Sequence, residues 1–73
     1  MEVRTNQFEF SHGRRPSGRG YWIIAVTGYK GTVPGTVQSF DHEGGGLLSQ
    51  VLKDAKAAAK ARGLCFVVAE VLP

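Results

Sequence analysis

Residues 47–72, LLSQVLKDAKAAAKARGLCFVVAEVL, carry the strongest structural signal in this sequence. From Leu47 to Arg62, apolar residues recur every three or four positions, which is the period of an amphipathic helix. Gly63 suits the end of a helix, and the segment Leu64–Leu72, mostly apolar on both faces, is typical of a buried strand. The segment therefore predicts a helix packed on a sheet. The expected contact stripe comprises Leu48, Val51, Leu52, Ala55, Ala58 and Ala59.

Three strands are expected before this helix. The alternation Gln7-Phe8-Glu9-Phe10 has the period-2 pattern of a half-buried strand, which we extend back to about Val3. Tyr21–Thr27 is rich in β-branched and aromatic residues and predicts a central strand. Thr32–Phe40 predicts a third strand, and Pro34 confines it to a sheet edge or a bulge because proline has no N–H to donate.

Glycine-rich segments separate these strands. Ser11–Gly20 holds three glycines and a proline and predicts a loop, Gly28–Gly31 predicts a tight turn, and Asp41–Gly46 predicts a break. The expected fold is a single α+β domain over residues 1–73 with the order β-β-β-α-β. Its four-stranded, mostly antiparallel sheet carries one helix packed on one face. We expect the strand order 3-2-1-4, with the fourth strand parallel to the first.

The composition is that of a small folded protein. A hydrophobic content of 42% argues against disorder. Cys65 is the only cysteine, so an internal disulfide is excluded, and no leader-like segment follows Met1. These features predict a cytoplasmic location. The longest apolar run is far shorter than the roughly 20 residues that span a bilayer, so no membrane contact is expected.

One helix can cover only one face of the expected sheet. The second and fourth strands are apolar on both sides, so the other face would expose apolar residues. Such a surface predicts a homodimer or a tight hetero-partner.

Positive charge gathers in two places in a chain whose net charge is +3. Arg14, Arg15 and Arg19 lie in the Ser11–Gly20 loop. Lys53, Lys56 and Lys60 fall at positions i, i+3 and i+7 on the polar face of the expected helix. Both groups predict contacts to an anionic partner, either nucleic acid or an acidic protein surface. The alternatives are a merely solvated loop and the ordinary wet face of an amphipathic helix.

The sequence offers little support for catalysis. The arginine loop lacks the Lys-Ser/Thr pair that a nucleotide-hydrolysing phosphate loop needs, and a strand follows it instead of a helix. His12, His42 and Cys65 have no metal-ligand spacing, and Cys65 is expected to pack inside its strand. No acid, base and nucleophile converge, so we expect no enzyme, no cofactor and no metal.

The favoured hypothesis is a small nucleic-acid-binding protein that contacts phosphates through an Arg-rich hairpin loop and a Lys-lined helix. It lacks the aromatic pairs, GXXG loop and helix-turn-helix of common modules. Tyr21, Trp22 and Tyr29 would stack on bases if they face outward, although packing is the expected use of these aromatics. The alternative is a small protein-binding module or inhibitor, for example a phage-type, anti-CRISPR-like protein, that recognises an acidic protein surface.

Overall fold

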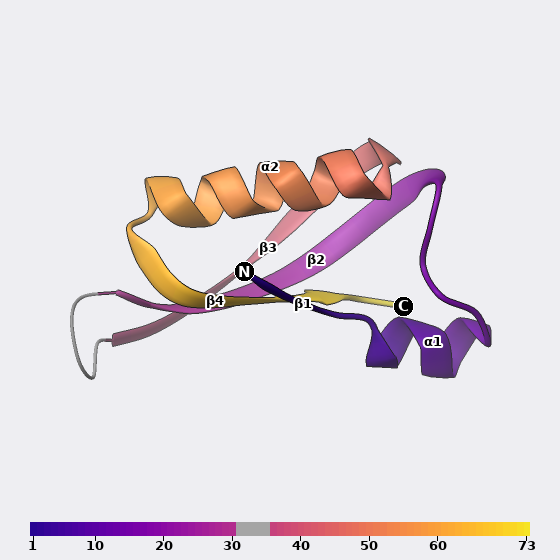
Figure 1. Ribbon diagram of the computed structural model, residues 1–73, viewed down its shortest axis with the longest axis horizontal. Coiled ribbons are helices and arrows are strands. Elements are labelled where there is room, and N and C mark those ends of the chain that lie inside the picture. The colour runs from indigo at the N-terminus through magenta and orange to yellow at the C-terminus, as the bar shows by residue number, and fades with distance from the viewer. Residues whose placement is uncertain (31–35) are drawn as a thin grey trace.

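A computed structural model describes residues 1–30 and 36–73 of the chain, and its strands form one four-stranded mixed sheet in the order β1-β4-β2-β3. β1 runs parallel to β4, whereas β2 runs antiparallel to both β4 and β3. The α+β class is confirmed, but the described residues form two helices where one was expected (Figure 1). The elements are β1 (Glu2–Arg4), α1 (Asn6–His12), β2 (Arg19–Lys30), β3 (Thr36–Leu47), α2 (Leu48–Ala61) and β4 (Leu64–Val71).

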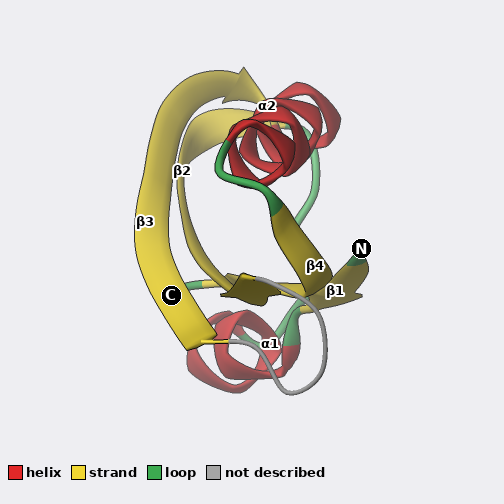
Figure 2. Ribbon diagram, turned by 90° about the vertical axis from the view of Figure 1, so that its left-hand side faces the viewer, coloured by secondary structure: helices red, strands yellow, loops and turns green. Residues whose placement is uncertain are grey.

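α2 forms the main layer on one face of the sheet and confirms the predicted helix to within one residue at each end. Figure 2 shows the sheet curling toward α2, so that the helix lies on its concave side. The alanines at the contact let the helix backbone approach the strands closely, while Leu52 is half-buried at the margin. The core between helix and sheet contains Leu48, Val51, Ala55 and Ala59 of α2 with Ile24, Val26, Ala69 and Val71 of the strands.

The segment expected as the first strand is a strand only to Arg4 and then becomes α1. Phe8 and His12, one helical turn apart, stack with their ring centroids 4.1 Å apart. The Thr5 hydroxyl donates a hydrogen bond to the Glu9 carboxylate. Gly13 then ends the helix in the left-handed conformation with φ of 69°. These local contacts outweigh the four-residue alternation, which is too short to separate a helix from a strand.

α1 lies against β4 on the side of the sheet away from α2 and closes one end of the core (Figure 1). Phe8 is buried, and its ring centroid lies 5.6 Å from that of Trp22. The Trp22 indole Nε1–H in turn donates to the Gly46 carbonyl oxygen at 3.1 Å. The expectation that the second sheet face carries no helix is therefore wrong at this end.

β2 and β3 are both longer than expected. They pair without a shift from Arg19 opposite Leu47 to Lys30 opposite Thr36. The segment Asp41–Gly46, expected as a break, therefore continues β3, and Tyr29, expected in a tight turn, lies in β2. Continuous pairing with β2 outweighs the low strand propensity of the three glycines. Pro34 lies outside the described residues.

The predicted strand order 3-2-1-4 is wrong, although the parallel pairing of the first and fourth strands is confirmed. β4 inserts between β1 and β2 and pairs with both. β4 buries Ala69 and Val71, which suits it to a central place. The three-residue β1 is left at the edge. Among residues 1–30 and 36–73, no helix has the length and apolar character needed to cross a membrane.

Candidate functional site

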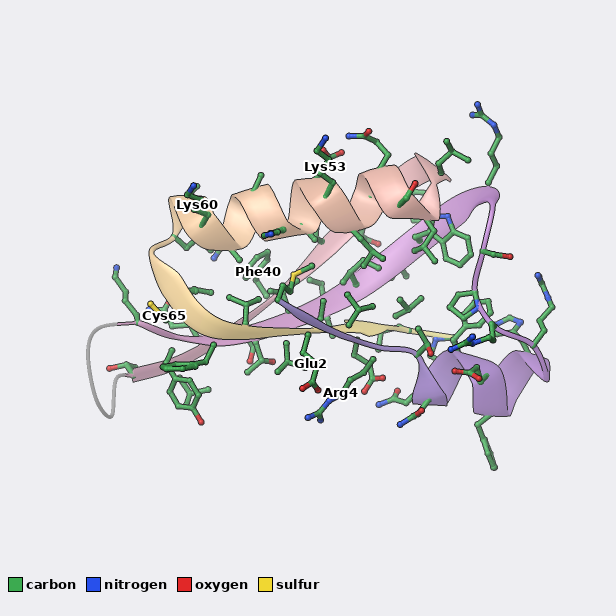
Figure 3. The ribbon with its side chains drawn as sticks, viewed as in Figure 1. Glu2, Arg4, Phe40, Lys53, Lys60 and Cys65 are labelled. Carbon is green, nitrogen blue, oxygen red and sulfur yellow. The ribbon has the colours of Figure 1, made fainter. Side chains whose placement is uncertain are left out.

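Three exposed lysines follow one flank of α2. At 3.6 residues per turn, Lys53, Lys56 and Lys60 fall within an arc of about 60°. This arc lies away from the buried side of the helix, and Figure 3 shows Lys53 and Lys60 pointing away from the sheet. We call Lys53, Lys56 and Lys60 the lysine flank. The amphipathic stripe fixes its orientation, because burying the stripe turns this flank to solvent.

The lysine flank borders a hollow of about 560 Å³ between α2, β4 and the start of β1. Lys56 and Lys60 line the hollow from the helix, and Phe66 and Val67 are among the residues that line it from β4. Glu2 also borders the hollow, but its carboxylate forms an ion pair with Arg4. Figure 3 shows both Glu2 and Arg4 on the side of the sheet away from α2. The hollow thus combines two cations and the Glu2 carboxylate with apolar side chains.

The loop arginines do not form one cluster. The loop joins α1 to β2 and is not a hairpin between two strands, so that part of the sequence interpretation is wrong. The Arg14 guanidinium carbon lies 6.0 Å from the centroid of the Phe8 ring on α1, and the neighbouring Arg15 is exposed.

Arg19, in contrast, is the first residue of β2 and pairs with Leu47, immediately before α2. The Leu48 N–H donates to the Gly18 carbonyl at 2.9 Å, which ties the end of the loop to the first turn of the helix. The backbone of Arg19 therefore lies beside the start of α2, whereas Arg14 lies with α1.

The sheet face away from α2 carries four carboxylates. In the β2–β3 register, Asp41 is opposite Ala25 and Glu43 is opposite Ile23. Ile24 and Val26 are buried beneath α2, so the alternation of side chains turns this set to the other face. Register places Glu70 and Glu2 there as well. The Glu2 hydrogen bond and negative charge raise the pKa of the Arg4 guanidinium on this face above its usual value.

Two aromatic side chains meet at the start of β4. Phe66 is 78% exposed and Tyr29 is 41% exposed, and their rings pack edge to face with centroids 6.4 Å apart. We call Phe66 and Tyr29 the aromatic pair. Of the aromatics named from sequence, Trp22 is buried, whereas Tyr21 and Tyr29 are exposed. Phe66 was missed because its apolar neighbours predict a buried strand and nothing in the sequence marks its exposure.

A β-bulge produces this exposure. Thr27 pairs with Val68 and Tyr29 pairs with Cys65, so the single residue Gly28 opposes both Phe66 and Val67. Phe66 takes φ of 53°, in the left-handed region that favours glycine. Cys65 is exposed, so the expectation that it packs inside the strand is wrong.

The same bulge crowds Gly28. A Cβ there would lie 3.0 Å from the Leu64 Cβ and 3.2 Å from the Cys65 carbonyl oxygen. A side chain at this position would require Leu64 and the Cys65 backbone to shift by a few tenths of an ångström.

Across the described ranges 1–30 and 36–73, no three His, Cys, Asp or Glu side chains gather closely enough to hold a metal ion. The features that stand out on this surface are the lysine flank, the aromatic pair and the carboxylates of the opposite face. No protein-family model, curated protein or solved structure matches the chain.

Proposed function

We propose that this protein binds nucleic acid and that the lysine flank contacts its phosphates. The observation that carries the proposal is the placement of Lys53, Lys56 and Lys60 along one side of a well-packed helix, all exposed. Three cations in a fixed row can neutralise phosphates of one backbone, which is the main source of affinity in non-specific binding.

The distribution of charge gives such binding a direction. Asp41, Glu43 and Glu70 lie on the opposite sheet face, where they would repel a phosphate backbone. On α2 itself, the exposed Asp54 accepts a hydrogen bond from the neutral Gln50 at 3.1 Å and keeps its negative charge next to Lys53, which reduces the positive charge of this side. Negative charge on the open sheet face and positive charge on the helix side would steer a polyanion toward the lysine flank.

Lysines favour contacts to the backbone rather than to particular bases. The ammonium group is a compact charge on a flexible stem and has no fixed fork for reading a base edge. We therefore propose weak sequence selectivity. Arg19 would extend the contact at the start of α2, and Arg14 and Arg15 would add contacts from the α1 end.

The test is the salt dependence of binding after Lys53, Lys56 and Lys60 are replaced together by Gln. Glutamine keeps the helix propensity and removes the charge. The measurement is fluorescence anisotropy of a labelled strand of about 12 nucleotides between about 50 and 200 mM salt. We expect weaker binding at low salt. The slope of log K against log salt should become shallower by about 2, because each contact to a single strand contributes about 0.7.

The control is the double variant Glu2→Gln/Arg4→Gln, which removes the ion pair of the opposite face and leaves no unpaired carboxylate beside the hollow. It should change neither affinity nor slope. In parallel, replacing Arg14, Arg15 and Arg19 by Gln measures the share of binding that the loop supplies. If the lysine variant keeps the parent slope, the phosphates do not meet this flank. If the parent ignores oligonucleotides at low salt and holds a Glu-rich peptide instead, the ligand is an acidic protein surface and the proposal is wrong.

A further inference from the structure

We infer that the nucleic acid is single-stranded and that its bases stack on Phe66 and Tyr29. This inference rests on the proposed function, because it assigns a ligand class to the same surface. It draws on the position of the aromatic pair, the backbone conformation of Phe66 and the lysines that share its hollow.

The position of Phe66 links the aromatic pair to the lysine flank. Phe66 lines the same hollow of about 560 Å³ as Lys56 and Lys60. Tyr29 alternates with the buried Gly28 and therefore faces away from α2, and Glu2 and Val68 continue the hollow toward that side. A strand whose phosphates follow these lysines therefore has to pass around the start of β4 for its bases to reach the two rings. A basic groove beside exposed aromatics is the usual arrangement for binding single strands, since every base offers a face for stacking. In a duplex the bases already stack on one another, so this contact is lost.

The backbone at Phe66 argues against a purely structural role for its ring. A bulky residue at φ of 53° is a conformational outlier that glycine would adopt without strain. Its ring is 78% exposed, so burial returns little of that cost. Strained residues with exposed recognition groups cluster at binding sites, which makes the outlier a reason to assign function.

Phe10 is a natural comparison within the same chain. It is even more exposed, at 94%, but it lies on α1, at the end of the molecule opposite the start of β4 (Figure 1). Exposure of a phenyl ring alone therefore does not single out Phe66; its conformation and its place beside Lys56 and Lys60 do.

The experiment compares two strands of about 12 nucleotides, one of thymidines and one with the same phosphates but no bases. Phosphate contacts are common to both probes, whereas stacking is possible only with the first. For the parent protein we expect the base-bearing strand to bind about 5- to 100-fold more tightly than the abasic strand. Phe66→Gly should reduce that preference, because Tyr29 is then the one ring of the pair left for stacking, and leave the salt slope unchanged. Phe10→Ala should behave like the parent, and circular dichroism verifies that each variant is folded.

A second readout reports stacking directly and does not depend on affinity. Phe66→Trp keeps an aromatic face and places an exposed indole at the site, while the native Trp22 is buried. We expect the thymidine strand to quench the fluorescence of this variant, and we expect the abasic strand to leave it unchanged.

The outcomes separate this inference from the proposed function. If the parent binds both probes equally, or binds a duplex of the same length more tightly than the thymidine strand, the stacking inference fails while phosphate binding by the lysine flank stands. If Phe66→Gly instead dissociates a dimer in sedimentation and keeps the preference for bases, the aromatic pair is a subunit contact and the inference fails as well. If no oligonucleotide binds at low salt, the proposed function fails first.

Discussion

Gly28 on β2 and Phe66 on β4 oppose each other across the bulge, and the local geometry favours glycine at both positions. Gly28 occupies a crowded position, where a Cβ would lie 3.0 Å from the Leu64 Cβ and 3.2 Å from the Cys65 carbonyl oxygen. Phe66, across the bulge, holds a left-handed conformation in which glycine would be more comfortable. Because Phe66 is largely exposed, its side chain adds little hydrophobic burial. The backbone geometry of the bulge therefore decides how substitutions here change the free energy of unfolding.

Substitutions at these positions should therefore move stability in opposite directions. We expect Gly28→Ala to lower the free energy of unfolding by about 1–3 kcal/mol, as overpacking does. Phe66→Gly should leave it unchanged or raise it by up to about 1.5 kcal/mol. Relief of left-handed strain gives about 1–2 kcal/mol, and glycine's extra chain entropy offsets about 0.5–1. Urea denaturation measures both. A clear loss of stability in Phe66→Gly would show that the ring contributes to packing and would weaken its assignment as a binding residue.

The sequence predicted some site residues and could not predict others. The exposure of Lys53, Lys56 and Lys60 follows from the helical period, since their positions relative to Leu48 and Val51 require only 3.6 residues per turn. The exposure of Phe66 depends on a register shift between β2 and β4, which no local pattern encodes. The separation of Arg14 from Arg19 depends on the placement of α1, which was assigned to the wrong type of element.

At the scale of elements, α1 is the helix that depends most on packing against the rest of the fold. A helix of seven residues is too short to form alone in water. Its buried anchor is Phe8, which is 5% exposed and lies against Trp22, whereas Phe10 on the same helix is 94% exposed. The helix therefore depends on one side chain for its place in the core.

We expect Phe8→Ala to destabilise the protein by about 3–5 kcal/mol, the usual range for truncating a buried phenylalanine. Since a chain of this length has only about 3–5 kcal/mol of net stability, a large fraction of the variant should be unfolded. Phe10→Ala on the same helix should stay within about 0.5 kcal/mol of the parent, as exposed positions do. Thermal and urea unfolding compare the two, and equal effects would mean that α1 is not anchored as described.

Elements with a long periodic signal were predicted correctly, and short or glycine-containing ones were not. α2 spans about four turns and β4 is mostly apolar, so both were found. α1 offers a single Phe–His pair and competes with a four-residue alternation. The glycines at positions 44–46 predict a break, yet pairing with β2 carries β3 through them. Tertiary pairing decided these cases, and it is not visible in a local window.

At the scale of the whole molecule, the two faces of the sheet differ in charge. The lysine flank lies on the α2 side, and Glu2, Asp41, Glu43 and Glu70 lie on the other side. This separation leads us to assign the phosphates to the helix side, whereas the bases would reach Tyr29, which faces the other side because it alternates with the buried Gly28. The homodimer expected from the sequence stays a prediction. A twofold contact through the open face would bring these carboxylates together, which costs free energy near neutral pH.

The most direct test of the account is an amide NMR titration of the protein with a short single strand. We expect shifts along α2 from Lys53 to Lys60 and at Cys65, Phe66 and Val67, with little change at Asp41 and Glu43. Those shifts should weaken as salt is raised, because the contacts to phosphate are electrostatic. Shifts confined to the sheet face around Asp41 and Glu43, or the absence of any shift at low salt, would contradict the assignment of nucleic-acid binding to the lysine flank.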